Sequence, residues 1–326
     1  MMRALFVGLL VAGAAQSVSA ESLHEQAQRW FGDGQPPAEV ATLNPAEVTL
    51  GHQLFFDDRI GKDGTSCGSC HVYEKGGADG RATAIGAFAR VGKRNTPTVV
   101  DITPQISMHW IGDRASLSDQ AIRSLTAPPA YAHESVDDAL AVVKSLPDLT
   151  QQFDALYDDG VTADNWGRAL TAYQVSLVTE SPFDRYLQGN HKALTPAQQQ
   201  GLQTFIDTGC AACHSGRLLG GNSYQRFGLV EDYLPYTGSA YDAGRMALTG
   251  NPADDRVYKV PPIRHAVQTA PYFHDGSVDD IERAVWIMAK VQLGRDLADE
   301  QVASIVTFLQ AATAPMPQAM KPPVLP

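Results

Sequence analysis

The four cysteines of the chain form two copies of one short motif. They stand in Cys67-Gly68-Ser69-Cys70-His71 and in Cys210-Ala211-Ala212-Cys213-His214, so a histidine directly follows each pair. This C-x-x-C-H spacing is the attachment signature of a c-type haem. Each thiol bonds one vinyl group of the porphyrin, and the histidine ligates the iron from the proximal side. The spacing therefore predicts two covalently bound haem c groups.

A structural zinc site and a redox dithiol are the alternative interpretations of these cysteines. A zinc site favours two pairs that are closer together and does not need a histidine after each pair. A redox dithiol leaves the two histidines without a role. Two disulfides would also suit an oxidising compartment, but the repeated spacing favours haem.

The helices expected before the two motifs look like one repeated unit. Asn44-Pro45-Ala46-Glu47 and Thr195-Pro196-Ala197-Gln198 each combine a capping residue, a proline at the first helical position and a side chain suited to a capping box. Each expected helix also carries a glycine and a phenylalanine, namely Gly51 with Phe55 and Gly201 with Phe205. This similarity predicts an internal repeat of a cytochrome c-like unit.

Helical periodicity continues through the rest of the chain. Apolar residues recur at helical spacing in Val136–Ser145, Leu149–Asp158, Ala163–Val178, Ile281–Val291 and Asp299–Ala311. Few alternating runs are present, and Gly- and Pro-rich loops separate the periodic stretches. We therefore expect a mostly α fold with two cytochrome c-like haem domains, residues 21–190 and 191–326, and long connecting loops. The proline-rich tail after Ala314 is expected to be extended or mobile.

The first 20 residues predict an export signal. Arg3 precedes the short apolar run Ala4–Ala15, and Val18-Ser19-Ala20 suits a cleavage site. A buried N-terminal helix is the alternative. Neither this run nor any later one is long enough to span a membrane, so we expect a periplasmic protein that is not membrane-spanning.

Composition limits the partners. The 326 residues include 44% hydrophobic residues, and the net charge is −11. These values exclude wholesale disorder. The acidic balance and the lack of a basic stripe argue against nucleic acid and are compatible with a basic protein partner.

Further stretches surround the two motifs in a characteristic order. They are Leu50-Gly51…Leu54-Phe55-Phe56-Asp57, Thr83-Ala84-Ile85-Gly86, Asn95-Thr96-Pro97-Thr98, Gly209-Cys210…His214-Ser215-Gly216…Leu219-Gly220-Gly221 and Thr269-Ala270-Pro271-Tyr272-Phe273-His274-Asp275-Gly276. In these stretches the chain resembles the bacterial di-haem cytochrome c peroxidase family over nearly its whole mature length. The resemblance implies a low-potential N-terminal haem where hydrogen peroxide reacts, a high-potential C-terminal haem that receives electrons, and a calcium ion between the domains. It also implies a small electron-donor protein, either a cytochrome c or a cupredoxin, and leaves a homodimer open.

Met288 is the candidate distal ligand of the second haem. It lies 74 residues after His214, in Trp286-Ile287-Met288-Ala289-Lys290, which resembles the ligand segment of the family. A thioether ligand stabilises ferrous iron and raises the potential of a haem, as an electron-receiving centre requires. An ordinary core methionine on an amphipathic helix is the alternative.

The first haem is where the chain departs from the family pattern. Much of the family has a distal histidine directly after Thr-x-Ile-Gly, whereas this chain has Ala87. The first haem is therefore either five-coordinate or covered by another group. His109 precedes Trp110, which matches the inter-haem tryptophan of the family. His109 is a distal acid-base group, a replacement ligand or a partly buried histidine with a backbone partner, and nearby Met108 is another option.

Three further roles follow from the resemblance. Glu134 falls where the family has its catalytic glutamate, which moves protons during peroxide cleavage; a solvated loop residue is the alternative. Calcium would be held by Asn95 and by backbone oxygens of Thr269 and Pro271, although Asn95 could equally be a turn former. Trp110 is either an electron relay or core packing.

Three functional classes remain. The first is a periplasmic hydrogen-peroxide reductase whose first haem is open at rest. The second resembles the methylamine-utilisation branch of the superfamily, which oxidises residues of a partner protein. Ala87 and Lys93-Arg94-Asn95-Thr96-Pro97 favour that branch, while Met288 speaks against it, because the branch places tyrosine on the second haem. The third is an electron carrier, which would need both axial positions of each haem filled.

Overall fold

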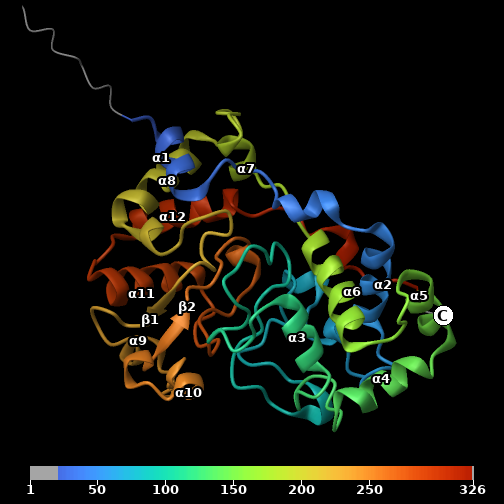
Figure 1. The fold of residues 1–326 in the computed structure, drawn as a ribbon. Coiled ribbons are helices and arrows are strands. Elements are labelled where there is room, and N and C mark those ends of the chain that lie inside the picture. The colour runs from blue at the N-terminus through green and yellow to red at the C-terminus, as the bar shows by residue number, and fades with distance from the viewer. Residues whose placement is uncertain (1–20, 325–326) are drawn as a thin grey trace, which may run out of the picture.

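The computed structural model describes residues 21–324, so the expected export signal at residues 1–20 lies outside the described part. The mostly α fold is confirmed (Figure 1). The helices are α1 Leu23–Phe31, α2 Pro45–Phe56, α3 Leu117–Ser124, α4 Val136–Lys144, α5 Pro147–Leu156, α6 Ala163–Ser176, α7 Pro182–Leu187, α8 Pro196–Thr208, α9 Leu234–Thr237, α10 Met246–Thr249, α11 Ile281–Leu293 and α12 Asp299–Ala311. Strands β1 Tyr224–Arg226 and β2 Val257–Lys259 pair antiparallel.

The two repeated helices begin differently from one another. At the start of α8, Thr195 and Gln198 form the predicted reciprocal capping box. At the start of α2, the Asn44 side chain accepts a hydrogen bond from the Ala46 N–H, as a capping residue should. The predicted partner Glu47 does not complete a box there, because its carboxylate instead pairs with Arg168 of α6 at 2.7 Å. The box prediction is therefore wrong for α2.

The repeat is visible in how each of these helices meets a second one. Helix α2 packs against α6, and α8 packs against α12. A Cβ atom added at Gly51 would lie 2.0 Å from the Ala169 carbonyl oxygen, and one at Gly201 would lie 2.1 Å from the Ser304 carbonyl oxygen. Glycine at these two positions therefore lets each helix pair approach more closely than a side chain would permit.

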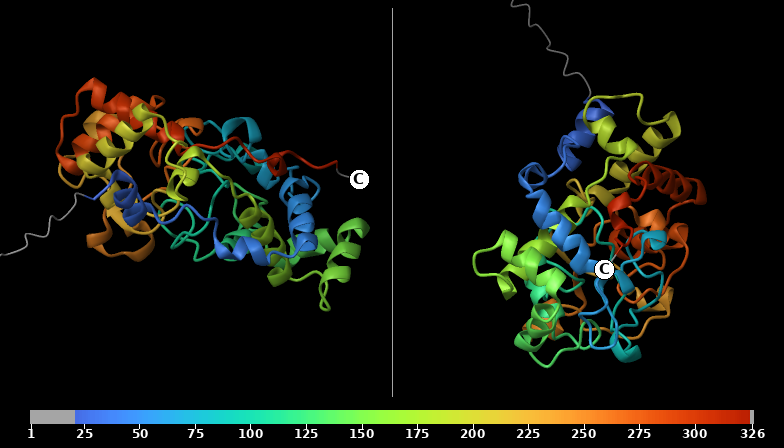
Figure 2. Two further views of the ribbon diagram at one scale, coloured as in Figure 1. Left: turned by 90° about the horizontal axis from the view of Figure 1, so that it is seen from above. Right: turned by 90° about the vertical axis from the view of Figure 1, so that its right-hand side faces the viewer.

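Two helical groups lie at opposite ends of the molecule, with long loops between them (Figures 1 and 2). One hydrophobic core includes residues of α2, α4, α5 and α6, and the other includes residues of α8 and α12. The cores cross the predicted boundary at residues 190 and 191. Phe31 of α1 and Phe183 of α7 lie in the second core, whereas Met320 lies in the first.

The tail after α12 is largely extended, with one 3-10 turn at Gln318–Met320, and it packs against the first core. Met320 is fully buried, and the Tyr173 hydroxyl donates to the Ala319 carbonyl oxygen at 2.8 Å. These contacts attach the tail to α6.

A buried charge network joins segments from both halves of the sequence. Asp101 accepts from Arg217 at 2.7 Å and from His265 at 2.8 Å, and it lies 3.0 Å from Arg264. Arg264 also donates to Asp184 at 2.8 Å. Burial opposes ionisation of Asp101, but the His265 hydrogen bond and the two guanidinium groups hold its pKa well below its usual range.

Within residues 21–324, no helix has the length and apolar character needed to cross a membrane.

Candidate haem sites and the segments between them

The first C-x-x-C-H motif folds as a tight turn that presents its histidine. Residues Cys67–Ser69 form a 3-10 turn, and the His71 N–H donates to the Cys67 carbonyl oxygen at 3.0 Å. His71 Nδ1 lies 2.9 Å from the Gly77 carbonyl oxygen, so Nδ1 carries the proton and Nε2 keeps its lone pair. Burial lowers the pKa of His71 and keeps the ring neutral. A neutral imidazole with a free Nε2 is the form that ligates iron.

The second motif has the same geometry. Cys210–Ala212 is again a 3-10 turn, and the His214 N–H donates to the Cys210 carbonyl oxygen at 3.0 Å. His214 Nδ1 lies 3.0 Å from the Leu219 carbonyl oxygen, and burial lowers the pKa of this ring as well. The predicted repeat thus extends to the orientation of each histidine.

The thiols of both motifs are available for thioether bonds. All four cysteines are free and partly exposed. Burial of the sulfur atoms raises the pKa of Cys67 to about 11 and that of Cys210 to about 12. Free thiols beside a histidine with an open Nε2 fit covalently attached haem at both positions. Among the described residues, no group of three or more His, Cys, Asp or Glu side chains could hold a metal ion by itself.

Ala87 lies on a strained loop close to the first motif. It is fully buried, and the next two residues, Phe88 and Ala89, have φ of 56° and 57°. A Cβ atom at Gly86 would lie 1.7 Å from the Pro129 carbonyl oxygen, so this loop contacts the loop that leads to Glu134. The Ala87 methyl group offers no donor atom to a metal.

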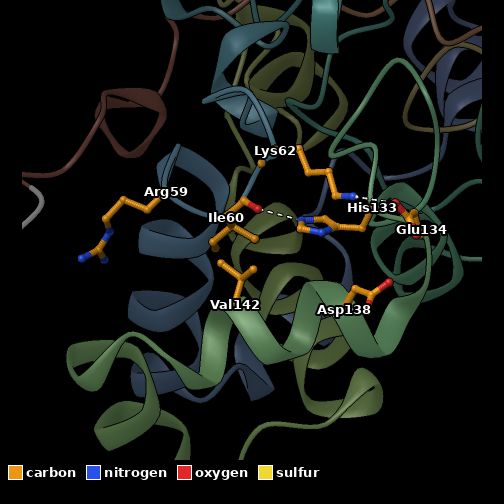
Figure 3. Close-up of a pocket in the computed structure, with 8 residues that line it drawn as sticks. Arg59, Ile60, Lys62, His133, Glu134, Asp138 and Val142 are labelled. Atoms are coloured by element: carbon orange, nitrogen blue, oxygen red, sulfur yellow. Dashed lines mark hydrogen bonds and ion pairs between the residues drawn. The ribbon is translucent and has the colours of Figure 1, made fainter.

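Glu134 lies at a polar pocket of about 510 Å³ (Figure 3). Its side chain is 86% exposed and pairs with Lys62 at 3.4 Å. Neighbouring His133 is buried and bonds the Ile60 carbonyl oxygen at 2.8 Å through Nε2. The Tyr131 hydroxyl lies 3.3 Å from Cys67 Sγ, so the loop that carries Glu134 also contacts the first cysteine pair.

His109 is oriented by a carboxylate rather than by the backbone. Its Nδ1 lies 3.0 Å from Asp113 Oδ1, and Asp113 also pairs with Arg114 at 2.5 Å. Burial opposes ionisation of Asp113, but the hydrogen bond from His109 and the nearby charges lower its pKa to about 2. The His109 side chain is 36% exposed. The backbone partner that we considered for it is thus replaced by Asp113.

Trp110 lies where the two halves of the sequence meet. Its indole N–H donates to the Asn95 carbonyl oxygen at 2.9 Å, and the Asn95 N–H donates to the His274 carbonyl oxygen at 2.7 Å. The Trp110 and His274 rings meet edge to face with centroids 6.4 Å apart. Trp110 therefore contacts both segments that the sequence pointed to for calcium.

The three candidate calcium ligands lie on neighbouring segments. Asn95 is buried, and its side-chain amide donates to the Arg81 carbonyl oxygen at 2.8 Å. Within the described chain, no hydrogen bond reaches Asn95 Oδ1 or the carbonyl oxygens of Thr269 and Pro271. One amide oxygen and two carbonyl oxygens without donors are suitable ligands for a hard cation.

Met288 is only half buried on α11, between the buried residues Ile287 and Ala289. It packs, as Trp110 does, against the hydrophobic cluster that contains Ile287. Met288 is thus less enclosed than an ordinary core methionine would be, and its thioether carries no hydrogen bond to the described residues.

A comparison with known proteins identifies the family. A family profile described as di-haem cytochrome c peroxidase matches residues 45–192. The chain is 36% identical to the cytochrome c551 peroxidase of Pseudomonas aeruginosa over 96% of its own length and 93% of that protein. This chain belongs to the di-haem cytochrome c peroxidase family. It is accordingly an enzyme of the di-haem oxidoreductase class with sites for two haem groups.

Two further similarities agree with this assignment. The chain is 38% identical to the cytochrome c peroxidase Ccp of Escherichia coli over 85% of its own length, and it spans 60% of that protein. A MauG-like protein associated with microbial copper homeostasis has a similar structure, with a TM-score of 0.73 and 23% identity over 86% of this chain and 92% of that one. The second similarity concerns the fold alone.

Sequence reasoning missed the charge network around Asp101 and the buried Lys259. Apart from the adjacent Arg264 and His265, these residues are far apart in the sequence, without a spacing that links them. The order of the loops brings them together, so only the three-dimensional structure reveals them.

Proposed function

We propose that this enzyme reduces hydrogen peroxide to water with electrons from a small cytochrome c or cupredoxin. The balanced reaction is H₂O₂ + 2 H⁺ + 2 e⁻ → 2 H₂O. The observation that carries the proposal is the difference between the two motifs: Ala87 offers no ligand near the first, whereas α11 offers the half-buried Met288 for the second. Haem iron at the first site supplies the redox chemistry that cleaves the peroxide bond.

The residues of the first site orient a ligand and move protons. The Gly77 carbonyl oxygen fixes the His71 ring so that Nε2 is directed to iron. Glu134 is the acid-base group in this proposal. Its carboxylate takes a proton from one oxygen of hydrogen peroxide and delivers it to the other oxygen, which leaves as water. Lys62 holds Glu134 at the pocket mouth in the described structure. His109, fixed by Asp113, is a second candidate for proton transfer.

Trp110 and calcium join the two sites in this proposal. His214 and Met288 would hold the iron of the second haem, which would supply the electron-accepting chemistry, and Trp110 would lie on the route of electrons toward the first site. Calcium at Asn95, Thr269 and Pro271 fastens the segments on either side of that tryptophan. Addition of one equivalent of Ca²⁺ to the calcium-free enzyme should then restore electron transfer between the haems, measured by stopped-flow absorbance. An unchanged rate of electron transfer would contradict the role of calcium.

The expected export signal at residues 1–20 supports a periplasmic enzyme, and a homodimer is the assembly we propose. Fractionation of cells that express the full chain, followed by light scattering of the purified enzyme, tests both statements. A cytoplasmic precursor without haem would contradict the first, and a monomeric mass at working concentration would contradict the second.

Steady-state turnover of peroxide with a reduced small cytochrome c tests the main proposal. We expect Glu134→Gln to lower kcat by 10²- to 10⁴-fold, the range for loss of a general acid-base group, with haem content unchanged. Asp138→Asn, at the same pocket, is the matched control and should retain activity. Cys210→Ala or Cys213→Ala should remove most stable haem from the second site, and two fully loaded covalent haems in either variant would refute that attachment.

Oxidation of a partner protein is the second candidate function, favoured by Ala87. The basic stretch at residues 93–97 supports it less than we expected, because Arg94 pairs with Asp242 at 2.7 Å instead of facing a partner. Mass spectrometry of neighbouring proteins after exposure to enzyme and peroxide would reveal this activity as oxidised side chains.

A further inference from the structure

Lys259 is a buried cation without an anionic partner. The residue lies at the end of β2 and is 5% exposed. Its ammonium donates to Gln105 Oε1 and, at 2.8 Å, to the Ser107 carbonyl oxygen. Both acceptors are neutral, and no described carboxylate pairs with it. Burial alone lowers the pKa of Lys259 to about 8, with no charged neighbour contributing.

Arg264 is another deeply buried cation, and unlike Lys259 it is paired with carboxylates. It is 2% exposed and lies between two carboxylates, Asp101 at 3.0 Å and Asp184 at 2.5 Å. A buried charge left without a counter-ion is strongly destabilising, whereas a paired one is tolerated. No described residue of the protein supplies a negative group beside Lys259. A bound group is therefore needed to supply that charge.

The position of Lys259 indicates where that group comes from. The Lys259 N–H donates to the Trp110 carbonyl oxygen at 2.8 Å. The Gln105 side chain lies against Gly221, two residues after Leu219, whose carbonyl oxygen orients His214. Gln105 is itself held by its amide, which donates to the Ile102 carbonyl oxygen at 2.7 Å. Lys259 thus adjoins Trp110 through its backbone, and its ammonium contacts Gln105, whose side chain packs against the loop that follows the histidine of the second site.

We propose that Lys259 binds a propionate carboxylate of the haem attached at Cys210 and Cys213. Haem carries two such carboxylates, and an ammonium–carboxylate hydrogen bond is among the stronger kinds in proteins. Gln105 orients the ammonium toward the propionate. The inference rests on the proposed attachment of haem at the second site.

A redox titration of the holoenzyme tests the inference. Lys259→Met keeps an apolar stem of similar length and removes the charge. Loss of a positive charge beside the haem favours the ferric form, so we expect the midpoint potential of the second haem to fall, by about 59 mV if the equilibrium for its reduction changes tenfold. Lys192→Met, at an exposed position, is the matched control and should leave both potentials unchanged.

Haem content is measured first, so that a failure of haem attachment at the second site is distinguished from a failure of the proposed contact between Lys259 and the propionate. A single covalent haem in the unsubstituted protein would refute the attachment, not the role of Lys259. With two haems present in Lys259→Met, an unchanged potential of the second haem, or a shift confined to the first, would overturn the inference.

A spectroscopic measurement on the unsubstituted enzyme covers the case in which Lys259→Met does not load haem. Infrared spectra with isotope-labelled propionates should show an ionised carboxylate at the second haem at neutral pH. A fully protonated propionate pair there would overturn the inference. In Gln105→Leu, which keeps the charge but loses one acceptor, the potential should change less than in Lys259→Met.

Discussion

In the proposed function, Ala87 and Met288 give the two cofactor positions different chemistry through a single side chain each. A methyl group cannot ligate iron, whereas a thioether can. The loop of Ala87 contacts the first motif, since Cys70 Sγ lies 3.9 Å from the Ile85 carbonyl oxygen, and Met288 lies on α11. Their buried and half-buried positions agree with the proposed roles. The asymmetry between an open and a closed haem thus depends on two residues.

The resting ferric enzyme should be high-spin at the first haem and should react with peroxide without prior reduction. A family member with a distal histidine must first break a bond and shift to a different conformation, which costs free energy. Ala87 has no such bond to break. Electron paramagnetic resonance of the oxidised protein, followed by rapid mixing with peroxide, measures both properties.

Ligation of the first haem iron by His109 is the alternative to an open site. The Nδ1 atom of His109 is bonded to Asp113 at 3.0 Å, which leaves Nε2 without an assigned partner among the described residues. Because we propose that the first haem is open, we expect His109→Ala to leave the spin state unchanged. A purely low-spin spectrum that becomes high-spin in His109→Ala would show that this histidine has replaced the missing ligand.

Met288→Ala should abolish the methionine-ligated signature of the second haem and lower its potential. Loss of the thioether removes the ligand that favours ferrous iron. The sulfur-to-iron charge-transfer band and a redox titration report the change. Met246→Ala, elsewhere in the second half of the chain, is the control, and a band that persists in Met288→Ala would make Met288 a packing residue only.

At the scale of elements, the fold is built from two helix crossings that each require a glycine. Gly51 and Gly201 occupy equivalent positions in α2 and α8, and each faces a carbonyl oxygen of its partner helix at a distance that excludes a side chain. The sequence revealed both glycines as part of the repeat, but only the structure shows why they are needed.

Gly51→Ala and Gly201→Ala should each reduce the free energy of unfolding by about 1–3 kcal/mol, the usual effect of overpacking. The added methyl group forces the crossing helices apart and outweighs the better helix propensity of alanine. Denaturant unfolding of the holoenzyme measures the change. Gln200→Ala, at an exposed position beside Gly201, should be nearly neutral, and equal effects at residues 200 and 201 would refute the explanation.

Local sequence signals predicted elements better than the packing between them. Helix α12 has the predicted bounds, and α11 continues two residues beyond its prediction to Leu293, where Gly294 adopts φ 64° and ends it. Periodicity and capping are local properties, so they predict helices well. They contain no information on which helices meet, and α1 and α7 therefore pack in a core that the linear boundary did not assign to them.

At the scale of the whole molecule, the Asp101 network fastens segments that are distant in sequence. Three basic side chains converge on this carboxylate: Arg217 lies three residues after the second motif, and Arg264 and His265 lie on one later segment. Segments from both halves of the sequence are thus held together in part by ion pairs outside the two C-x-x-C-H motifs.

Asp101→Asn should lower the free energy of unfolding by about 3–5 kcal/mol, because it leaves buried cations without their partner. The pKa of Asp101 is lower in the folded than in the unfolded chain, where it is about 3.9. Its stabilising contribution is therefore fully present above that value and is lost as the pH falls toward the folded-state pKa. Unfolding measured from pH 7 to pH 3 should show a weaker acid dependence in Asp101→Asn than in the parent, with Asp207→Asn, at an exposed site, as the control.

The crossing of the two cores imposes an order on biogenesis. Helix α1 packs with partners in α8 and α12, while the core around the first cysteine pair includes Met320, about 250 residues after Cys70. A chain that emerges from a secretion channel N-terminus first cannot close its first core until almost all of it has crossed. Under the proposed export, Met320 would complete the first core only after Cys67 and Cys70 have left the channel, so haem attachment at this pair would precede the final packing of the first core.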